Sequence, residues 1–277
     1  MWSKALPSPR DDRDYPASAA LDMSAAAELP AEFEVWQPPV ENQGSVGNCV
    51  AQAVANIMEC IAHNYGEDHR DYSVGYVYGM STASGAGMNM REACAVLVKE
   101  GDVLRSVWEC LEENPDCRNK RQTVGEDIKA QARKTLAYVR LQTAEEAKAF
   151  IYKYKLPILI SAPTTAFMFG GGYHAVAVYG WDTQAFKYTN SWGTGGFFGD
   201  GRGKIQFEKI TELWGIIPME KVKLTDIEES WAKDDIQYLA DRGIVTGYED
   251  NTYRPKQAIT REEMAAMIAR AVRHLSK

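Results

Sequence analysis

One short segment of the sequence could supply a nucleophile for covalent chemistry. Residues 43–49 read QGSVGNC and end in Cys49, directly before a stretch with helical periodicity. A cysteine in the first turn of a helix lies in the positive field of the helix N-terminus, which favours the thiolate and lowers the thiol pKa. Because the thiolate is the attacking form, Cys49 is a candidate nucleophile. The alternative is a buried, inert cysteine.

Two further segments carry groups that could serve such a nucleophile. His174 follows two glycines and Tyr173 and begins an apolar, strand-like run, so the backbone would hold its imidazole rigidly. Asn190 lies in the segment 188–193, YTNSWG. An asparagine oxygen can accept a hydrogen bond from one imidazole nitrogen and so select the tautomer, and an aromatic lid such as Trp192 would keep water from that bond.

Together the three segments resemble the papain-like cysteine peptidases. That family places a Gln and glycines before its nucleophile, as in residues 43–49, and its His and Asn roughly 130 to 150 residues downstream. The string NSWG at 190–193, followed by a glycine-rich turn and a strand, is similar to the segment around the family's Asn. The resemblance covers roughly residues 29–217 and implies a two-lobed fold with the active site between the lobes.

The resemblance also implies a role for each residue. Cys49 would attack the peptide carbonyl, His174 would carry the proton, and Asn190 would orient the imidazole. Gln43 and the Cys49 backbone N–H would hold the oxyanion. Substrate-binding positions are expected at Gly87, Tyr173 and Trp192. No metal or cofactor is implied, and the partner is a protein or peptide substrate.

Two positions depart from the family pattern. Val46 stands where the family usually has a cysteine, so the disulfide formed there cannot exist, and Val50 replaces the aromatic residue after the nucleophile. Neither touches the reacting groups. Two other functions stay open: a peptide-binding module without catalysis, and a transpeptidase or isopeptidase joining surface proteins.

The elements that must position these residues follow an α+β order. Apolar spacing predicts helices first, with Asn48 as the N-cap of the first one, and strands later. This order indicates a helical lobe and a β-barrel-like lobe. The expected helices are Cys49–His63, Asn89–Lys99, Glu126–Thr135 and Ala144–Lys155, and the expected strands lie in 157–162, 174–181, 185–192 and 204–210.

The chain divides into three expected parts: an N-terminal extension (1–28), the peptidase domain (29–220) and a C-terminal module (224–277). The extension is either a loosely ordered tail or a short pro-segment over a groove, with residues 11–20 limiting access to the cleft. The module has a helix from Trp231 to Asp241, and a last helix after Thr260 that a capping box with Glu263 would start.

The C-terminal module resembles one S-layer homology (SLH) repeat, notably in Trp231-Ala232 and in ITREE at 259–263. Such repeats usually occur in threes and bind anionic cell-wall polysaccharide of bacteria. With a single repeat, three roles stay open: a stabilising cap, self-association into a homotrimer, and wall binding. Arg261 and Trp231 are the candidate partner-binding residues. The module suggests a source in a bacterium or its phage.

The amino-acid composition argues against several other classes of protein. The net charge of −7 and the pI near 5.3 argue against a nucleic-acid binder, and no apolar stretch approaches the roughly 20 residues of a membrane span. Five cysteines without a CxxC pair, and only four histidines, argue against a disulfide scaffold and against a zinc site. The first residues lack the apolar region of a secretory signal, whereas the module points to the cell surface, so localisation stays open.

Overall fold

The structure is a computed structural model of the 277-residue chain. It describes residues 4–9, 11, 14–21, 29–67, 70–82, 87–108, 132–167, 170–195, 199–219, 222–241 and 244–275. The chain forms two compact units, residues 1–218 and residues 219–277, and each is described by itself.

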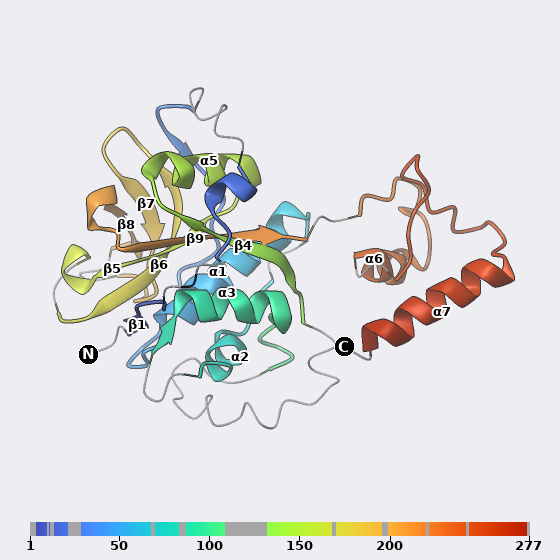
Figure 1. The fold of residues 1–277 in the computed structure, drawn as a ribbon, viewed down its shortest axis with the longest axis horizontal. Helices are drawn as coiled ribbons and strands as arrows, with labels where there is room; N and C mark the ends of the chain where they lie inside the picture. Colours follow the sequence, from blue (N-terminus) through green and yellow to red (C-terminus); the bar gives the residue numbers. More distant parts are fainter. Residues whose placement is uncertain are drawn as a thin grey trace. The chain divides into compact units, whose positions relative to one another are not determined.

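The first unit combines helices with a curled sheet (Figure 1). Its helices are α1 (Cys49–Asn64), α2 (Val74–Gly79), α3 (Met90–Lys99) and α5 (Ala144–Tyr154), with short 3-10 turns at Ala17–Ala19, Thr164–Ala166 and Phe207–Lys209. Its strands are β1 (Ala5–Leu6), β2 (Phe33–Glu34), β3 (Met88–Asn89), β4 (Thr135–Leu141), β5 (Ile158–Pro163), β6 (Tyr173–Trp181), β7 (Phe186–Thr189), β8 (Arg202–Ile205) and β9 (Glu212–Pro218).

One sheet joins all the described strands. Its main path runs β3-β1-β6-β5-β9-β4, and β6 also pairs with β2 and with the β7–β8 ribbon. Every pairing is antiparallel except that of β1 with β3. The long strand β6 is therefore the centre of the sheet, since it pairs with β1, β2, β5 and β7.

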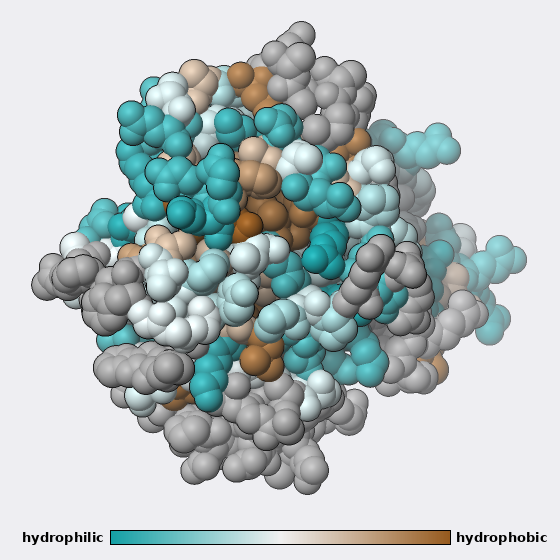
Figure 2. Space-filling view, turned by 60° about the vertical axis from the view of Figure 1, so that its left-hand side comes forward, coloured by the Kyte–Doolittle hydropathy of each residue, from teal (hydrophilic) through white to brown (hydrophobic). Residues whose placement is uncertain are grey.

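The two faces of the sheet carry different helices. Successive side chains of a strand point to opposite faces, so each buried strand feeds two cores. In β6, Ala175 and Ala177 pack with α1 in one hydrophobic core, while Val176 and Val178 pack with α5 in the other. In Figure 1, α1, α2 and α3 gather on one side of the sheet and α5 lies on the other. On the face drawn in Figure 2, the most prominent hydrophobic area lies near the centre and is bordered by hydrophilic residues.

Most of the predicted helices and strands are present, but the structure corrects the first helix cap, one helix and one strand. Helix α1 starts at Cys49 as predicted, but the Asn48 side chain makes no capping hydrogen bond. The predicted helix Glu126–Thr135 lies mostly outside the described residues, and Thr135 begins strand β4 instead. The predicted strand at 204–210 gives way after Ile205 to the 3-10 turn at Phe207–Lys209.

The second unit is small and contains α6 (Lys233–Asp241) and α7 (Arg261–Leu275). The predicted capping box is confirmed, because the Thr260 hydroxyl accepts the Glu263 backbone N–H at 3.1 Å and the Glu263 carboxylate accepts the Thr260 N–H at 2.8 Å. Its core is a single cluster of buried side chains: Leu224, Ile227, Ile236, Ala240, Ile244 and Val245.

The close approach of α5 to β9 gives a prediction for the fold. A Cβ atom at Gly215 would overlap the ring of Phe150, which is fully buried. We expect Gly215→Ala to lower the free energy of unfolding by about 1–3 kcal/mol through overpacking, measured by urea denaturation. Phe150→Leu should relieve the overlap, so the double variant should lose less stability than the sum of the single losses. Additive losses would contradict this origin.

Candidate active site

The packing of α1 on β6 brings the candidate nucleophile beside the candidate base. Cys49 is the first residue of α1 and is fully buried. Its thiol lies within hydrogen-bond reach of the backbone of Ala175, the residue after His174 in β6. Two residues far apart in sequence are therefore adjacent because a helix N-terminus meets the beginning of a central strand.

Asn190 fixes the protonation pattern of His174. His174 Nε2 lies 2.8 Å from Asn190 Oδ1, and the same oxygen accepts the Ser191 backbone N–H at 2.8 Å. Because a backbone N–H needs an acceptor, this second bond identifies the atom as oxygen, so Nε2 is the donor. The neutral imidazole then carries its lone pair on Nδ1, which has no hydrogen-bond partner among the described residues. That nitrogen is free to accept a thiol proton.

Aromatic side chains enclose the imidazole. The Trp192 ring stacks on His174 at a centroid distance of 4.4 Å, as the sequence predicted for a lid. Phe167 presents its edge from another side at 5.1 Å. Sequence reasoning missed Phe167, because a single aromatic residue in a loop carries no spacing signal. Together the two rings exclude water from the His174–Asn190 bond and so strengthen it.

Gln43 is fully buried, and both ends of its side-chain amide are hydrogen-bonded. Its Nε2 donates to the Val46 carbonyl at 2.8 Å, and its Oε1 accepts the Ser191 hydroxyl at 2.7 Å. Ser191 thus connects Gln43 with Asn190, a link that the sequence shows only as the residue after Asn190. The predicted site residues come from separate elements of the first unit. Cys49 begins α1 and Gln43 lies in the loop before it. His174 lies in β6, and Asn190 directly follows β7.

Burial dominates the electrostatics of the site. It raises the pKa of the Cys49 thiol, although nearby backbone hydrogen bonds oppose the shift. It also lowers the pKa of His174 to about 4, against the raising effect of the Asn190 bond. The sequence predicted a lowered thiol pKa from the helix N-terminus. That expectation is wrong for this structure, because desolvation outweighs the helix dipole and both groups stay neutral.

The other predicted binding positions line the same region. Gly87 has a φ of 110°, and Tyr173 begins β6 and is 37% exposed. Residues Lys4–Leu6 lie between them, since Ala5 is paired with both Met88 and Tyr173. By contrast, the 3-10 turn at Ala17–Ala19 packs on β4, and Ala17 and Leu21 are buried in the α5 core. The part of the extension beside Cys49 is therefore Lys4–Leu6 and not residues 11–20.

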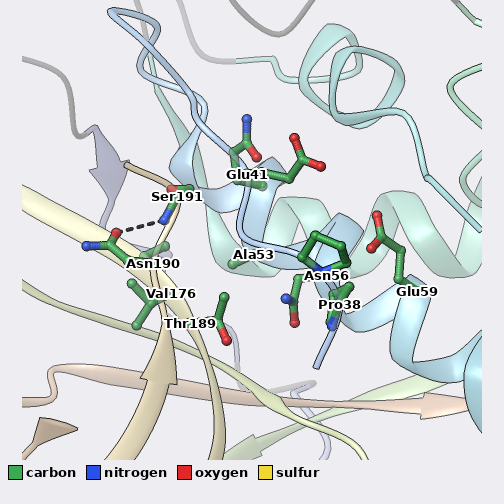
Figure 3. Close-up of a pocket in the computed structure, with 12 residues that line it drawn as sticks. Pro38, Glu41, Ala53, Asn56, Glu59, Val176, Thr189, Asn190 and Ser191 are labelled. Atoms are coloured by element: carbon green, nitrogen blue, oxygen red, sulfur yellow. Dashed lines mark hydrogen bonds between the residues drawn. The ribbon is translucent and has the colours of Figure 1, made fainter. Parts of the chain in front are cut away.

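A small pocket lies beside Asn190 and Ser191 (Figure 3). It is formed by α1, by β6 and by the chain around Asn190, and neither Cys49 nor His174 lines it. Glu59 contributes a carboxyl group whose pKa burial raises to about 9, so this group is neutral. The pocket is also lined by Glu41, whose carboxylate pairs with Arg105 at 3.2 Å.

In the second unit, Trp231 is 97% exposed and Arg261 is exposed at the start of α7. No cluster of three or more His, Cys, Asp or Glu that could hold a metal occurs among the described residues. Cys49, Cys60 and Cys94 are free thiols, and the remaining cysteines, Cys110 and Cys117, lie outside the described residues. No helix in the described ranges is both long and apolar enough to cross a membrane.

Comparison with solved structures defines the fold of the first unit. Xylellain, a cysteine protease from Xylella fastidiosa, aligns over 79% of this chain and 96% of its own, with a TM-score of 0.67 and 20% identity. The cysteine protease and lectin-like domains of Cwp84, a surface-layer-associated protein of Clostridium difficile, align over 78% of this chain and 55% of theirs (TM-score 0.57, 16% identity). The first unit has the papain-like cysteine protease fold.

Residues 223–265, in the second unit, match the family model of the S-layer homology domain. Endo-1,4-beta-xylanase A of Thermoanaerobacterium saccharolyticum is 51% identical over 49 residues, which are 18% of this chain and 4% of the xylanase. The cellulosome-anchoring protein of Acetivibrio thermocellus is 32% identical over 106 residues, which are 33% of this chain and 24% of that protein. The chain thus spans only a small part of these relatives.

The buried imidazole predicts a pH dependence of stability. The native state keeps His174 neutral down to about pH 4, whereas the unfolded chain protonates it near its ordinary pKa of 6.5. The stabilising contribution is therefore complete above pH 6.5 and is lost as the pH falls towards 4, by about 3 kcal/mol at most. Urea denaturation of the wild type and His174→Gln, which preserves a donor to Asn190, should show this difference. Parallel pH profiles would contradict it.

Proposed function

We propose that the first unit hydrolyses peptide bonds with Cys49 as nucleophile, His174 as acid and base, and Asn190 as the orienting group. The proton of the thiol passes to His174 Nδ1, and the thiolate sulfur attacks the substrate carbonyl carbon. His174 then protonates the leaving amine, and a thioester to Cys49 remains. Water, deprotonated by the same nitrogen, attacks the thioester and releases the acid product and the thiol.

The oxyanion of each tetrahedral intermediate needs donors that are already in place. We assign this role to the Cys49 backbone N–H and to a Gln43 Nε2 hydrogen. The bond from Ser191 to Gln43 Oε1 supports this assignment, because it fixes the amide orientation with the nitrogen on the loop before Cys49. The preformed donors would require no reorganisation as charge develops on the carbonyl oxygen.

The observation that carries the proposal is the His174–Asn190 bond beside a helix-initiating cysteine. It leaves Nδ1 as the acceptor, and the neighbouring residue Ala175 contacts the Cys49 thiol. A peptide-binding module without catalysis has no need for a tautomer selected in this way. The papain-like cysteine protease fold of the first unit supports the same class of hydrolase.

Substitutions test the assignment. We expect Cys49→Ala and His174→Ala to reduce kcat/KM on a fluorogenic peptide on the order of 10⁶-fold, because nucleophile and base act as a unit. Asn190→Ala should cost only about 10²-fold, since it misplaces the imidazole without removing it. Cys60→Ala is the matched control, because it removes another buried thiol from the same helix. Hydrolysis that survives Cys49→Ala would overturn the proposal.

The product distinguishes hydrolysis from acyl transfer. With an amine acceptor present, mass spectrometry of the products should find the free acid, because water resolves the thioester. Formation of the acceptor adduct as the main product would instead assign a transpeptidase or isopeptidase to the same residues. The two activities share every step up to the thioester, so the acceptor experiment separates them where the substitutions cannot.

We further propose that the second unit holds the protein at a bacterial cell surface, with Arg261 and Trp231 contacting an anionic wall polysaccharide. Trp231 presents a solvent-exposed aromatic ring. Arg261 carries a guanidinium group that can form two parallel hydrogen bonds to one anion. Matched relatives include the cellulosome-anchoring protein of Acetivibrio thermocellus and the outer membrane protein SlpA of Deinococcus radiodurans, 50% identical over 48 residues. These relatives are bacterial and give no support to a phage source.

We also propose that the second unit self-associates, so that the protein forms a trimer. Met264, Ile268 and Val272 recur every fourth residue on α7 and are 47–57% exposed, so they form one apolar stripe. We expect light scattering of the full chain to show a trimer at micromolar concentration, and Ile268→Glu to shift it towards monomer. Ala266→Glu places the same charge at another exposed position of α7 and should leave the assembly intact. A monomeric wild type would contradict the trimer.

A further inference from the structure

The donor segment, residues 41–43, is joined to residues 191–193 by a short ladder. The Gln43 N–H donates to the carbonyl of the first residue of the second segment at 2.8 Å, and the N–H of its last residue donates to the Glu41 carbonyl at 2.9 Å. The middle residues of the two segments form an isolated antiparallel bridge. Because so short a ladder opens easily, a contact from elsewhere can decide how firmly the donor segment is held.

A guanidinium group from another part of the first unit contacts the donor segment. Arg105 Nη2 lies 3.2 Å from Glu41 Oε2 and 3.1 Å from Asp71 Oδ1. The Arg105 backbone N–H also donates to the Asp71 carbonyl at 2.8 Å, and the neighbouring residues Tyr72 and Leu104 form an antiparallel bridge. Asp71 therefore holds Arg105 by its backbone and by its side chain, with the same nitrogen in contact with Glu41.

Arg105 offsets a repulsion between carboxylates. The Glu41 and Asp71 carboxylates contact the same nitrogen, so they lie close together and repel each other. Glu59 is a third carboxyl group nearby. Burial raises its pKa to about 9, the charges of Asp71 and Glu41 add to the rise, and the charge of Arg105 opposes it. Without the guanidinium, we expect the repulsion to move Glu41, and the donor segment with it, away from Asp71.

The exposure of the ion pairs indicates what they can and cannot do. The side chains of Arg105, Glu41 and Asp71 are between 34% and 40% exposed, so solvent screens the pairs and each is weak. They add little to the stability of the fold. A small displacement is nevertheless enough to disable an oxyanion donor, because such a donor must lie within about 2.7–3.1 Å of the oxygen that it stabilises.

We propose that Arg105 is a positioning residue for the reaction: through Glu41 it fixes the donor segment and so holds the Gln43 amide where the oxyanion forms. The inference rests on the proposed function for its kinetic consequence. The fixing of the donor segment is a separate property, which can be measured without catalysis.

Four variants of the full chain test this role. Arg105→Met removes the charge and keeps an unbranched side chain, and Glu41→Gln removes the ion pair from the other side. Arg105→Lys should preserve most of the effect, because a single nitrogen of Arg105 contacts both carboxylates and an ammonium group can do the same. Arg70→Met is the matched control, because Arg70 forms a partly exposed ion pair with Glu67, at 3.4 Å. Thermal unfolding should confirm that each variant remains folded.

The first readout is hydrogen exchange at the Gln43 and Gly193 amides, which form the ladder. We expect exchange about fivefold faster in Arg105→Met and in Glu41→Gln, as for the loss of one partly exposed ion pair, and no change in Arg105→Lys or Arg70→Met. The double variant of Arg105 and Glu41 should exchange no faster than either single variant, because both changes remove the same contact. Equal exchange in all folded variants would overturn the inference even if the protein hydrolyses peptides.

The second readout is kcat and KM on a fluorogenic peptide. Arg105→Met should lower kcat about fivefold and leave KM nearly unchanged, because the oxyanion contact is made only in the transition state. Arg105→Lys should restore kcat. The rate at which iodoacetamide labels Cys49 should stay the same, since alkylation forms no oxyanion. A rise in KM alone would assign Arg105 to substrate binding, and faster labelling would show that the whole site has shifted; either result would overturn the positioning role.

Failure of the proposed function is recognised separately. If the wild-type chain hydrolyses no peptide, the proposed function is refuted, while faster exchange in Arg105→Met would still show that Arg105 holds the donor segment. If the wild-type chain hydrolyses peptides and the variants match it in exchange and in kcat, the positioning role alone is refuted.

Discussion

The packing of α1 against β6 is the constraint on which the candidate site depends. Helix α1 brings a cysteine at its first residue, and β6 brings a histidine at its second. This packing places the Cys49 thiol against the backbone of Ala175, the residue that follows His174. The alanines of β6 allow this close approach, since Ala175 and Ala177 face α1 where larger side chains would push the helix away. The larger residues Val176 and Val178 face α5 on the opposite side.

Burial has two opposing effects on the candidate site: it fixes the geometry of the side chains, and it disfavours their charged forms. Buried hydrogen bonds through Asn190, Ser191 and Gln43 fix the geometry, and aromatic rings keep water away. The same burial disfavours charge, and a thiolate–imidazolium pair is charged. The dry environment that fixes Cys49 and His174 therefore also favours their neutral forms.

Local sequence signals predicted the parts of the fold that depend on nearby residues. Short apolar patterns predicted the helix that begins at Cys49 and the strand through His174. A four-residue motif predicted the capping box at Thr260. Strand β4 was missed because its partner β9 lies far along the chain, and pairing, not propensity, makes it a strand. The thiol pKa was misjudged for a related reason. The helix field is local, whereas the burial that raises the pKa of Cys49 comes from the packing of the whole first unit, and the backbone hydrogen bonds from Ala175 and Lys4 only oppose it.

Strand β1 has a consequence for how the thiol is covered. It pairs with β3 at Ala5 and Leu6 but with β6 at Ala5 alone, whereas β5 pairs with β6 at every residue from Ile158 to Pro163. Pairings this short open locally at a smaller free-energy cost than the long ladders of the same sheet. The burial that raises the pKa of Cys49 therefore borders one of the shortest pairings among the described strands.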